Sequence, residues 1–190
     1  MVRLSICSFW WLTLAVVYYG LSINSVSLAG NMYLNFILTA LVEIPGYCLS
    51  TVSLDRFGRK RPIMTAFFMC SVSLIAMPFV EIQWLRTLLN LVGKLFISMA
   101  FSSMYIFTGE LFPTEARHSL LGTCSMAGRV GAMVAPQTPL LMAYMESLPY
   151  LIFGVMSGVS CLLLLLAPET SKTKLPDTLY QAENIGIKKL

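Results

Sequence analysis

Charged residues are scarce in this 190-residue chain, at 12%, whereas a soluble domain carries about 25%. Hydrophobic residues make up 57%, and the mean hydropathy is +0.75. These values exclude a soluble protein and leave room for about five to seven membrane spans of roughly 20 residues. No basic stripe with interleaved aromatic residues lies outside the apolar runs, so we expect no nucleic-acid partner.

Motifs of metal binding and catalysis are also missing. The five cysteines form no Cys-x-x-Cys pair and lie within apolar runs, as small membrane-embedded hydrophobic residues do. The single histidine, His118, has no cysteine or histidine at the spacing of a metal site. No His-Glu-x-x-His motif occurs, and no serine inside the apolar runs is paired with a histidine. The sequence therefore predicts no metal site, no cofactor and no enzyme activity.

Six apolar segments are each long enough to cross a membrane, at residues 5–23, 32–51, 62–80, 86–108, 118–145 and 148–167. Backbone groups in lipid must pair within helices or closed barrels, and runs such as 162–166 lack the alternation of barrel strands. The predicted fold class is an all-α membrane protein, with a six-helix transmembrane bundle at 1–170 and a short cytoplasmic tail at 171–190. A cleavable signal peptide is the disfavoured alternative for the first segment, because its apolar run is too long.

Lysine and arginine are distributed unequally between the two sides of this bundle. If both termini are cytoplasmic, ten of the 13 lie on the cytoplasmic side and only Arg86 lies outside. The remaining two, Lys94 and Arg129, lie within spans. Cytoplasmic loops carry an excess of Lys and Arg, so we predict that both termini are cytoplasmic.

Two charged loops connect spans on this cytoplasmic side. The first is Leu54-Asp55-Arg56-Phe57-Gly58-Arg59-Lys60-Arg61-Pro62, and the second extends from Gly109 to Arg117. One interpretation is a pair of tight turns whose charges set the topology. The other is a conformational lock, in which Asp55 meets a helix N-terminus or an arginine in one conformation only. The candidates for this lock are Asp55, Arg56, Arg59, Glu110 and Arg117.

Two ionisable residues inside spans, Glu43 and Lys94, are candidates for an ion pair. Burying each costs about 2.5–3.5 kcal/mol on insertion scales, so each needs a partner, water or a transport pathway. Glu43 lies near mid-span, two residues before Pro45, where a freed carbonyl often lines a cavity. For Lys94, a structural role and contact with a substrate are both open interpretations.

Arg129 is the third ionisable residue inside a span. It lies near mid-span between Gly128 and Gly131, which are expected to leave room beside it. An unpaired arginine cannot face lipid, so we expect Arg129 to face a central cavity, with structural pairing as the alternative.

Aromatic residues mark one face of the first span. Trp11 and Tyr18 are seven residues apart, which is two helical turns. They belong either to an interface belt and ordinary packing or to an aromatic wall that holds an organic cation. Phe101, Tyr105 and Gln137 are weaker candidates for the same cavity.

Longer motifs follow one another along the chain: Asn31-Met-Tyr-Leu-Asn-Phe36, Val42-Glu-Ile-Pro-Gly-Tyr47, Leu54-Asp-Arg-Phe-Gly-Arg59, Gly93-Lys94, Tyr105-Ile-Phe-Thr-Gly-Glu-Leu-Phe-Pro-Thr114, Ser125-Met-Ala-Gly-Arg-Val-Gly131, Pro168-Glu-Thr170 and Leu175-Pro-Asp-Thr178. On these motifs the chain resembles the second half of the organic cation, organic anion and zwitterion transporter family, within the major facilitator superfamily. The resemblance implies helices seven to twelve of a twelve-helix carrier in the plasma membrane, with the N-terminal six-helix half missing. A fragment, a truncated gene model and a genuine short product are all open.

The resemblance also implies which charged residues distinguish the cation, anion and carnitine carriers of this family. Cation carriers of this family have an aspartate in place of Arg129, and anion carriers have the arginine together with a lysine in place of Tyr47. Carnitine carriers match this chain at both positions and are similar to it in keeping Glu43. The resemblance implies an aromatic wall at Trp11 and Tyr18. The substrate-binding candidates are then Trp11, Tyr18, Glu43, Tyr47, Lys94, Phe101, Tyr105, Arg129 and Gln137.

The function that this resemblance implies is transport of small organic ions by alternating access, favouring carnitine-like zwitterions or organic cations. Glu43 has the alternative role of binding a coupling sodium ion or proton. One alternative function is an organic anion carrier. Another is a truncated, non-transporting membrane subunit that binds or regulates a full-length carrier.

Overall fold

The computed structural model describes residues 2–27, 31–114, 116–167 and 169, and every regular element in this part of the chain is helical. The elements are α1 (Val2–Asn24), η1 (Ser25–Ser27), α2 (Met32–Leu41), α3 (Glu43–Phe57), α4 (Lys60–Ala76), η2 (Met77–Phe79), α5 (Gln83–Leu111), α6 (Arg117–Val134), η3 (Ala135–Gln137), α7 (Thr138–Met142) and α8 (Leu148–Leu165). The prediction of an all-helical membrane bundle is confirmed. The predicted tail at 171–190 lies outside the described residues.

Each of the six predicted spans coincides with a helical segment. Among the described residues, five segments are long and apolar enough to cross a membrane. The segment that does not meet this measure is α6 with η3 and α7, which includes Arg117, Arg129 and Gln137. Polar side chains in a span are tolerated where they face protein or a water-filled cavity, so the composition of α6 points to such a surface.

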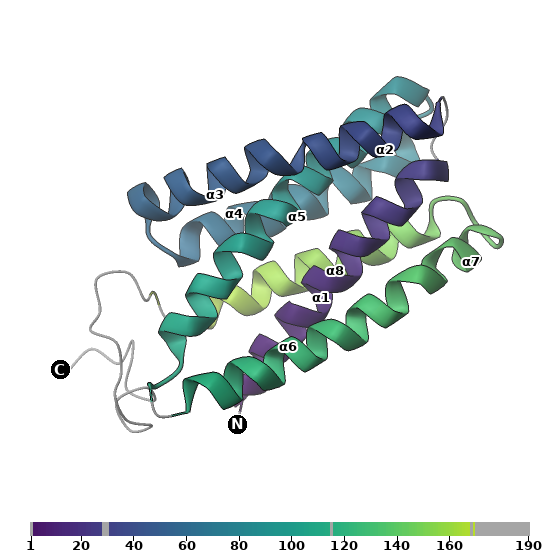
Figure 1. The fold of residues 1–190 in the computed structure, drawn as a ribbon. Helices are drawn as coiled ribbons and strands as arrows, with labels where there is room; N and C mark the ends of the chain where they lie inside the picture. Colours follow the sequence, from purple (N-terminus) through teal and green to yellow (C-terminus); the bar gives the residue numbers. More distant parts are fainter. Residues whose placement is uncertain (1, 28–30, 115, 168, 170–190) are drawn as a thin grey trace.

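The helices form two layers (Figure 1). In the nearer layer α3, α5, α1 and α6 lie side by side in that order, and α4 and α8 lie behind them. The rear helices pack on each other, and they also pack on α5 and α1. The nearer layer therefore presents a broad face that no other described helix covers.

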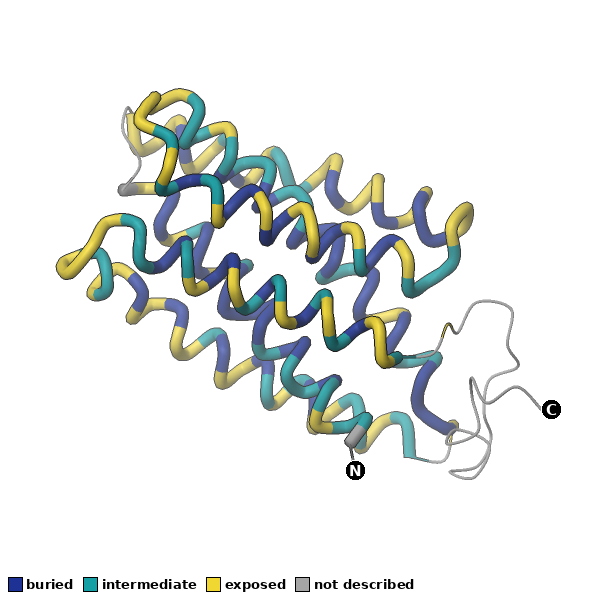
Figure 2. Tube along the Cα trace, turned by 180° about the vertical axis from the view of Figure 1, so that it is seen from behind, coloured by how far each residue is buried: buried dark blue, intermediate teal, exposed yellow. Residues whose placement is uncertain are grey.

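Buried residues lie on the sides of the helices that face other helices (Figure 2). Trp10, Phe67 and Phe153 are among the largest fully buried ones. Large hydrophobic residues such as Phe68 and Leu162 are instead exposed on the rear helices. Such an apolar exterior is expected of a bundle whose solvent is lipid rather than water.

The second span is broken at Val42, between α2 and α3. Proline has no backbone N–H, so Pro45 cannot donate the hydrogen bond that a helix directs to the carbonyl of Leu41. The break places Glu43 at the first residue of α3. A carboxylate therefore lies where the helical ladder is interrupted.

Glycines allow two neighbouring helix pairs to approach closely. A Cβ atom on Gly46 of α3 would lie 2.9 Å from the backbone oxygen of Leu95 on α5. On α6, a Cβ atom on Gly131 would lie 2.6 Å from the backbone oxygen of Leu12 on α1. Since the obstructing atoms belong to the backbone, a side chain can be added only if the helices move apart.

Gly131→Ala should therefore destabilise the protein by about 1–3 kcal/mol, as overpacking does. The matched control is Gly122→Ala on the same helix, where an added Cβ meets nothing within 4 Å. That change should be neutral or stabilising, because alanine favours a helix over glycine by up to about 1 kcal/mol. Thermal unfolding in one detergent measures both, and equal midpoints would contradict the close packing of α1 on α6.

Candidate functional site

An ion pair lies within the bundle where α3 meets α5. The ammonium nitrogen of Lys94 is 2.9 Å from Oε1 of Glu43. Lys94 has no exposed side-chain surface, and the Glu43 side chain is 23% exposed. The two charges thus neutralise each other at a depth where either alone would be costly.

The second oxygen of the Glu43 carboxylate binds a tyrosine. The hydroxyl of Tyr18 donates to Oε2 of Glu43 at 2.6 Å. The hydroxyl of Tyr47 lies 3.3 Å from that of Tyr18. A phenol has one proton to donate, so Tyr47 must be the donor to Tyr18. The carboxylate is therefore held by two helices besides its own.

The Lys94 ammonium is surrounded by acceptors and by an aromatic ring. It donates to the backbone oxygen of Tyr18 at 3.1 Å and to the hydroxyl of Ser22 at 2.7 Å. It also lies 3.2 Å from the centroid of the Tyr18 ring, in the geometry of a cation–π contact. These contacts join α5 to α1.

Four aromatic rings continue from this ion pair along α1 and α5. Tyr18 lies 5.2 Å from Phe101, which lies 5.6 Å from Tyr105, and Tyr105 meets the edge of Trp11 at 4.4 Å. The indole nitrogen of Trp11 donates to the hydroxyl of Thr108 at 3.2 Å. The structure thus brings seven of the nine predicted residues together. We call Trp11, Tyr18, Glu43, Tyr47, Lys94, Phe101 and Tyr105 the central cluster.

Arg129 lies on α6, outside this cluster. It is exposed, and no ion pair or hydrogen bond joins its side chain to another described residue. The expectation that its flanking glycines leave room beside it is wrong. Gly131 faces the backbone of α1, and a Cβ on Gly128 would touch Trp11 at 3.5 Å, so both glycines serve helix packing.

The side of α6 that carries Arg129 follows from helical geometry. Residues are about 100° apart, so Gly131, Gly128 and Arg129 follow one another around α6 in that order. Gly128 faces the Trp11 indole, which itself reaches Thr108 on α5. Arg129 therefore lies on the flank of α6 that is turned toward α5 and the central cluster.

Gln137 is exposed in η3, and no contact joins its side chain to the central cluster within the described residues. Across those same residues, no group of three or more His, Cys, Asp or Glu side chains is placed to hold a metal ion.

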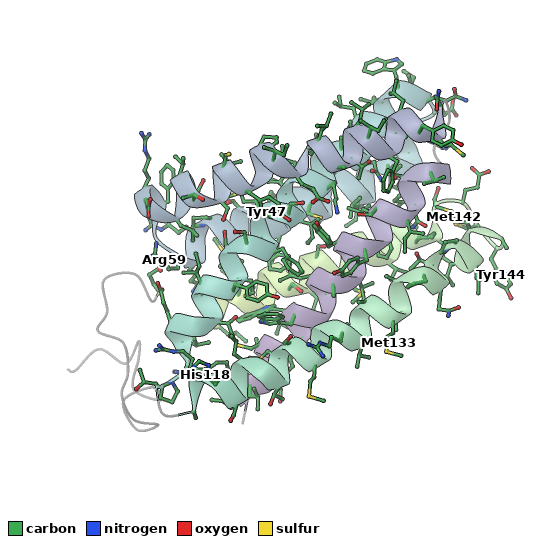
Figure 3. All side chains as sticks on the ribbon, in the orientation of Figure 1. Tyr47, Arg59, His118, Met133, Met142 and Tyr144 are labelled. Carbon is green, nitrogen blue, oxygen red and sulfur yellow. The ribbon has the colours of Figure 1, made fainter. Side chains whose placement is uncertain are left out.

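The charged turns lie at one end of the bundle. Figure 3 shows Arg59 and His118 at this end, and Met142 and Tyr144 at the opposite end. Arg59 pairs with Oε1 of Glu110 at 3.1 Å and donates to the backbone oxygen of Leu54. These two candidates for the conformational lock therefore connect the turn after α3 with the end of α5.

The other three candidates for the lock are not part of this pair. Arg117 donates to the backbone oxygen of Phe112 at 3.4 Å. Asp55 and Arg56 are exposed, and neither side chain has an ion pair or hydrogen bond in the described part of the chain. The contact of Asp55 with a helix N-terminus or an arginine is absent there in this conformation.

The sequence analysis missed two polar residues, one beside the Glu43–Lys94 ion pair and one at the turn between α3 and α4. Ser22 accepts from Lys94, and its position four residues after Tyr18, on the same face of α1, was the available signal. Glu169 accepts from the backbone N–H groups of Arg59 and Lys60, at 3.0 and 3.3 Å. It lies against Gly58, whose φ of 87° makes the turn possible. Its place in the Pro168-Glu169-Thr170 motif was the signal.

The central cluster has the chemistry of an ammonium site. A carboxylate, a tyrosine ring, a carbonyl and a hydroxyl surround one nitrogen cation, which here belongs to Lys94. Rings and carboxylates are the groups that bind alkylammonium ligands in general. The cluster lies among the helices of the nearer layer, whose outer face no described helix covers.

A model of the Major Facilitator Superfamily matches residues 3–185. The chain belongs to this superfamily. Proteins of the superfamily are transporters and not enzymes, in agreement with the sequence prediction. Since five helical segments within the described ranges are able to span a membrane, this superfamily member is an integral membrane protein.

The resemblance to organic cation, organic anion and zwitterion transporters that the motifs predicted is confirmed by individual relatives. The organic cation transporter protein of Drosophila melanogaster is 40% identical over 94% of the chain, which is 33% of that relative. Organic cation/carnitine transporter 2 of Homo sapiens is 37% identical over 90% of the chain and 31% of its own length. Solute carrier family 22 member 3 of Rattus norvegicus is 36% identical over 97% of the chain and 34% of its length. This superfamily member thus spans about a third of these relatives.

A double-mutant cycle tests the ion pair of Glu43 and Lys94. Glu43→Gln should cost about 3–5 kcal/mol, because it leaves a fully buried ammonium without its counter-charge. Lys94→Met should cost less, because the carboxylate that remains is partly exposed. The double variant should be more stable than the sum predicts by at least about 1 kcal/mol. Thermal unfolding of the four proteins in one detergent gives the coupling, and additivity within about 0.5 kcal/mol would contradict the pairing.

Proposed function

We propose that this chain forms one half of a transporter that moves small organic ions across the plasma membrane by alternating access. Its substrate would bind between the open face of the nearer layer and a second six-helix half, which is the partner that the proposal requires. The observation that carries the proposal is the ammonium of Lys94, held by Glu43 and the Tyr18 ring within the bundle. Relatives named as organic cation and carnitine transporters support it.

The charges around the central cluster favour a substrate that carries a carboxylate. Glu43 is neutralised by Lys94, whereas Arg129 has no partner among the described residues and is turned toward the same face. One net positive charge in a low-dielectric cavity repels a simple cation and attracts a carboxylate. Arg129 can also bind a carboxylate through two parallel hydrogen bonds.

The positive end of a zwitterion would compete with Lys94 for Glu43 and the Tyr18 ring. Its ammonium would lie against the rings of Tyr18 and Trp11, and Lys94 would give up part of its contact with Glu43. A simple organic anion would need Arg129 alone and would leave that pair intact. A coupling sodium ion or proton would act on the same carboxylate, because either would weaken its attraction for Lys94.

The pair of Arg59 and Glu110 would be the conformational lock. It links the turn after α3 to the end of α5, and it would hold in one orientation of the two halves. Asp55, which is exposed in this conformation, would find a partner in another.

Uptake by cells that express the chain together with a relative's N-terminal half tests the substrate class. Arg129→Asp should abolish carnitine uptake and raise uptake of tetraethylammonium, because it reverses the unpaired charge. Arg129→Lys should recover only part of the carnitine uptake, since an ammonium lacks the planar two-pronged contact.

The control for this series is Thr123→Ala, an exposed change on the same helix that should leave uptake unchanged. An aromatic carboxylate as a third substrate separates zwitterion from anion transport. Unchanged carnitine affinity and rate in a surface-expressed Arg129→Ala protein would show that Arg129 does not bind the substrate.

Arg59→Ala in the same paired protein should lower turnover at least tenfold while changing substrate affinity less than twofold. A residue that stabilises one conformation affects the switching rate more than the ligand contacts. Asp55→Ala should act in the same direction, and Arg59→Lys should restore part of the rate. Normal turnover in all three, at equal surface expression, would leave these residues as a simple turn.

A further inference from the structure

The four cations around the turn between α3 and α4 fall into two pairs. Arg59 and Lys60 are used inside the protein, by Glu110 and by the backbone oxygens of Leu54, Leu165 and Ala167. Arg56 and Arg61 are exposed, and neither side chain contacts an acidic or acceptor group in the described residues. A role in setting the orientation of the chain in the membrane explains why these two residues are positively charged. It does not explain why both side chains are exposed on the outside of the bundle.

Arg56 ends an exposed apolar stripe of α3. Pro45, Leu49, Val52 and Arg56 are all exposed, and their spacing of four, three and four residues places them on one face of the helix. Arg56 follows Tyr47 by nine residues, or about 180° around α3, so this stripe faces away from the central cluster. The stripe is an exposed apolar surface that stops at an arginine.

Arg61 begins a matching stripe on α4. Arg61, Thr65, Phe68 and Val72 are exposed at the same helical spacing, on the side of α4 opposite its buried face. The two stripes end on either side of the same turn, where the side chain of Phe57 is also exposed. In a membrane, both arginines would therefore lie at the level where acyl chains give way to headgroups.

From this arrangement we propose that Arg56, Phe57 and Arg61, with the apolar stripes that they end, form a binding site for an anionic phospholipid. We call it the Arg56–Arg61 surface. Two guanidinium groups would bind the phosphate and carboxylate of the headgroup, and the stripes of α3 and α4 would hold the acyl chains. The N-terminus of α4 is not available for the phosphate, because Glu169 already accepts from its N–H groups.

This site is independent of the substrate site proposed above. It lies on the opposite side of α3 from Tyr47, and its ligand is a component of the membrane rather than cargo. A bound lipid would support the turn that carries Arg59 and Lys60, because Arg56 and Arg61 flank the same turn.

Native mass spectrometry of the purified 190-residue chain, titrated with palmitoyl-oleoyl phosphatidylserine or phosphatidylcholine, tests the proposal. We expect tighter binding of phosphatidylserine. Arg56→Gln/Arg61→Gln should weaken that binding roughly 10- to 30-fold, to the level of phosphatidylcholine. Arg56→Lys/Arg61→Lys should retain most of it, because charge is kept.

The Lys188→Gln/Lys189→Gln variant loses the same amount of charge near the end of the sequence, outside the described residues, and should bind phosphatidylserine as the unchanged chain does. An equal loss in this control, or no preference for phosphatidylserine in the unchanged chain, would overturn the proposal. Soluble glycerophosphoserine should not compete at matched concentration, because it has no acyl chains. Competition by this headgroup alone would show a simple anion site and would also overturn the proposal.

Discussion

A cation without solvent contact, the ammonium of Lys94, sets the main constraint on this bundle. It is tolerated because four kinds of partner surround it: a carboxylate, a carbonyl, a hydroxyl and the face of a ring. Those partners come from α1 and α3, so one nitrogen fixes the mutual position of three helices. The aromatic rings that extend along α1 and α5 are aligned by the same contacts, because Tyr18 belongs to both sets.

The second organising feature is the division of the positive charges at the turn between α3 and α4 into an inward and an outward pair. Arg59 and Lys60 are directed inward and are satisfied by carboxylates and helix-end carbonyls, whereas Arg56 and Arg61 are directed outward. A helix advances about 100° per residue, and so neighbouring cations on either side of a tight turn reach different surroundings. One short basic segment can therefore serve both the protein interior and the membrane surface.

Periodicity and composition were sufficient to predict the six helical segments, because lipid permits few alternatives to a helix. The spacing of Trp11 and Tyr18 also indicated one face of α1, and both residues lie in the central cluster. Contacts between helices distant in sequence could not be predicted in the same way. Whether Lys94 reaches Glu43 depends on the packing of α3 on α5, which Gly46 controls through a close backbone approach. The glycines beside Arg129 were misinterpreted for the same reason, since a glycine indicates close packing but not which neighbour it meets.

The two sides of the nearer layer differ in stiffness. A glycine lies against a carbonyl of the neighbouring helix on both sides, Gly131 of α6 on α1 and Gly46 of α3 on α5, but on one side α6 is an unbroken helix from Arg117 to Val134. On the other side, the span of α2 and α3 has an interrupted hydrogen-bond ladder beside Glu43. Bending is therefore easier at Val42 than within α6, so a local movement around a bound ligand would involve α2. An inhibitor that binds beside the break at Val42 would oppose that bending, whereas one bound along α6 would contact a helix without such a break.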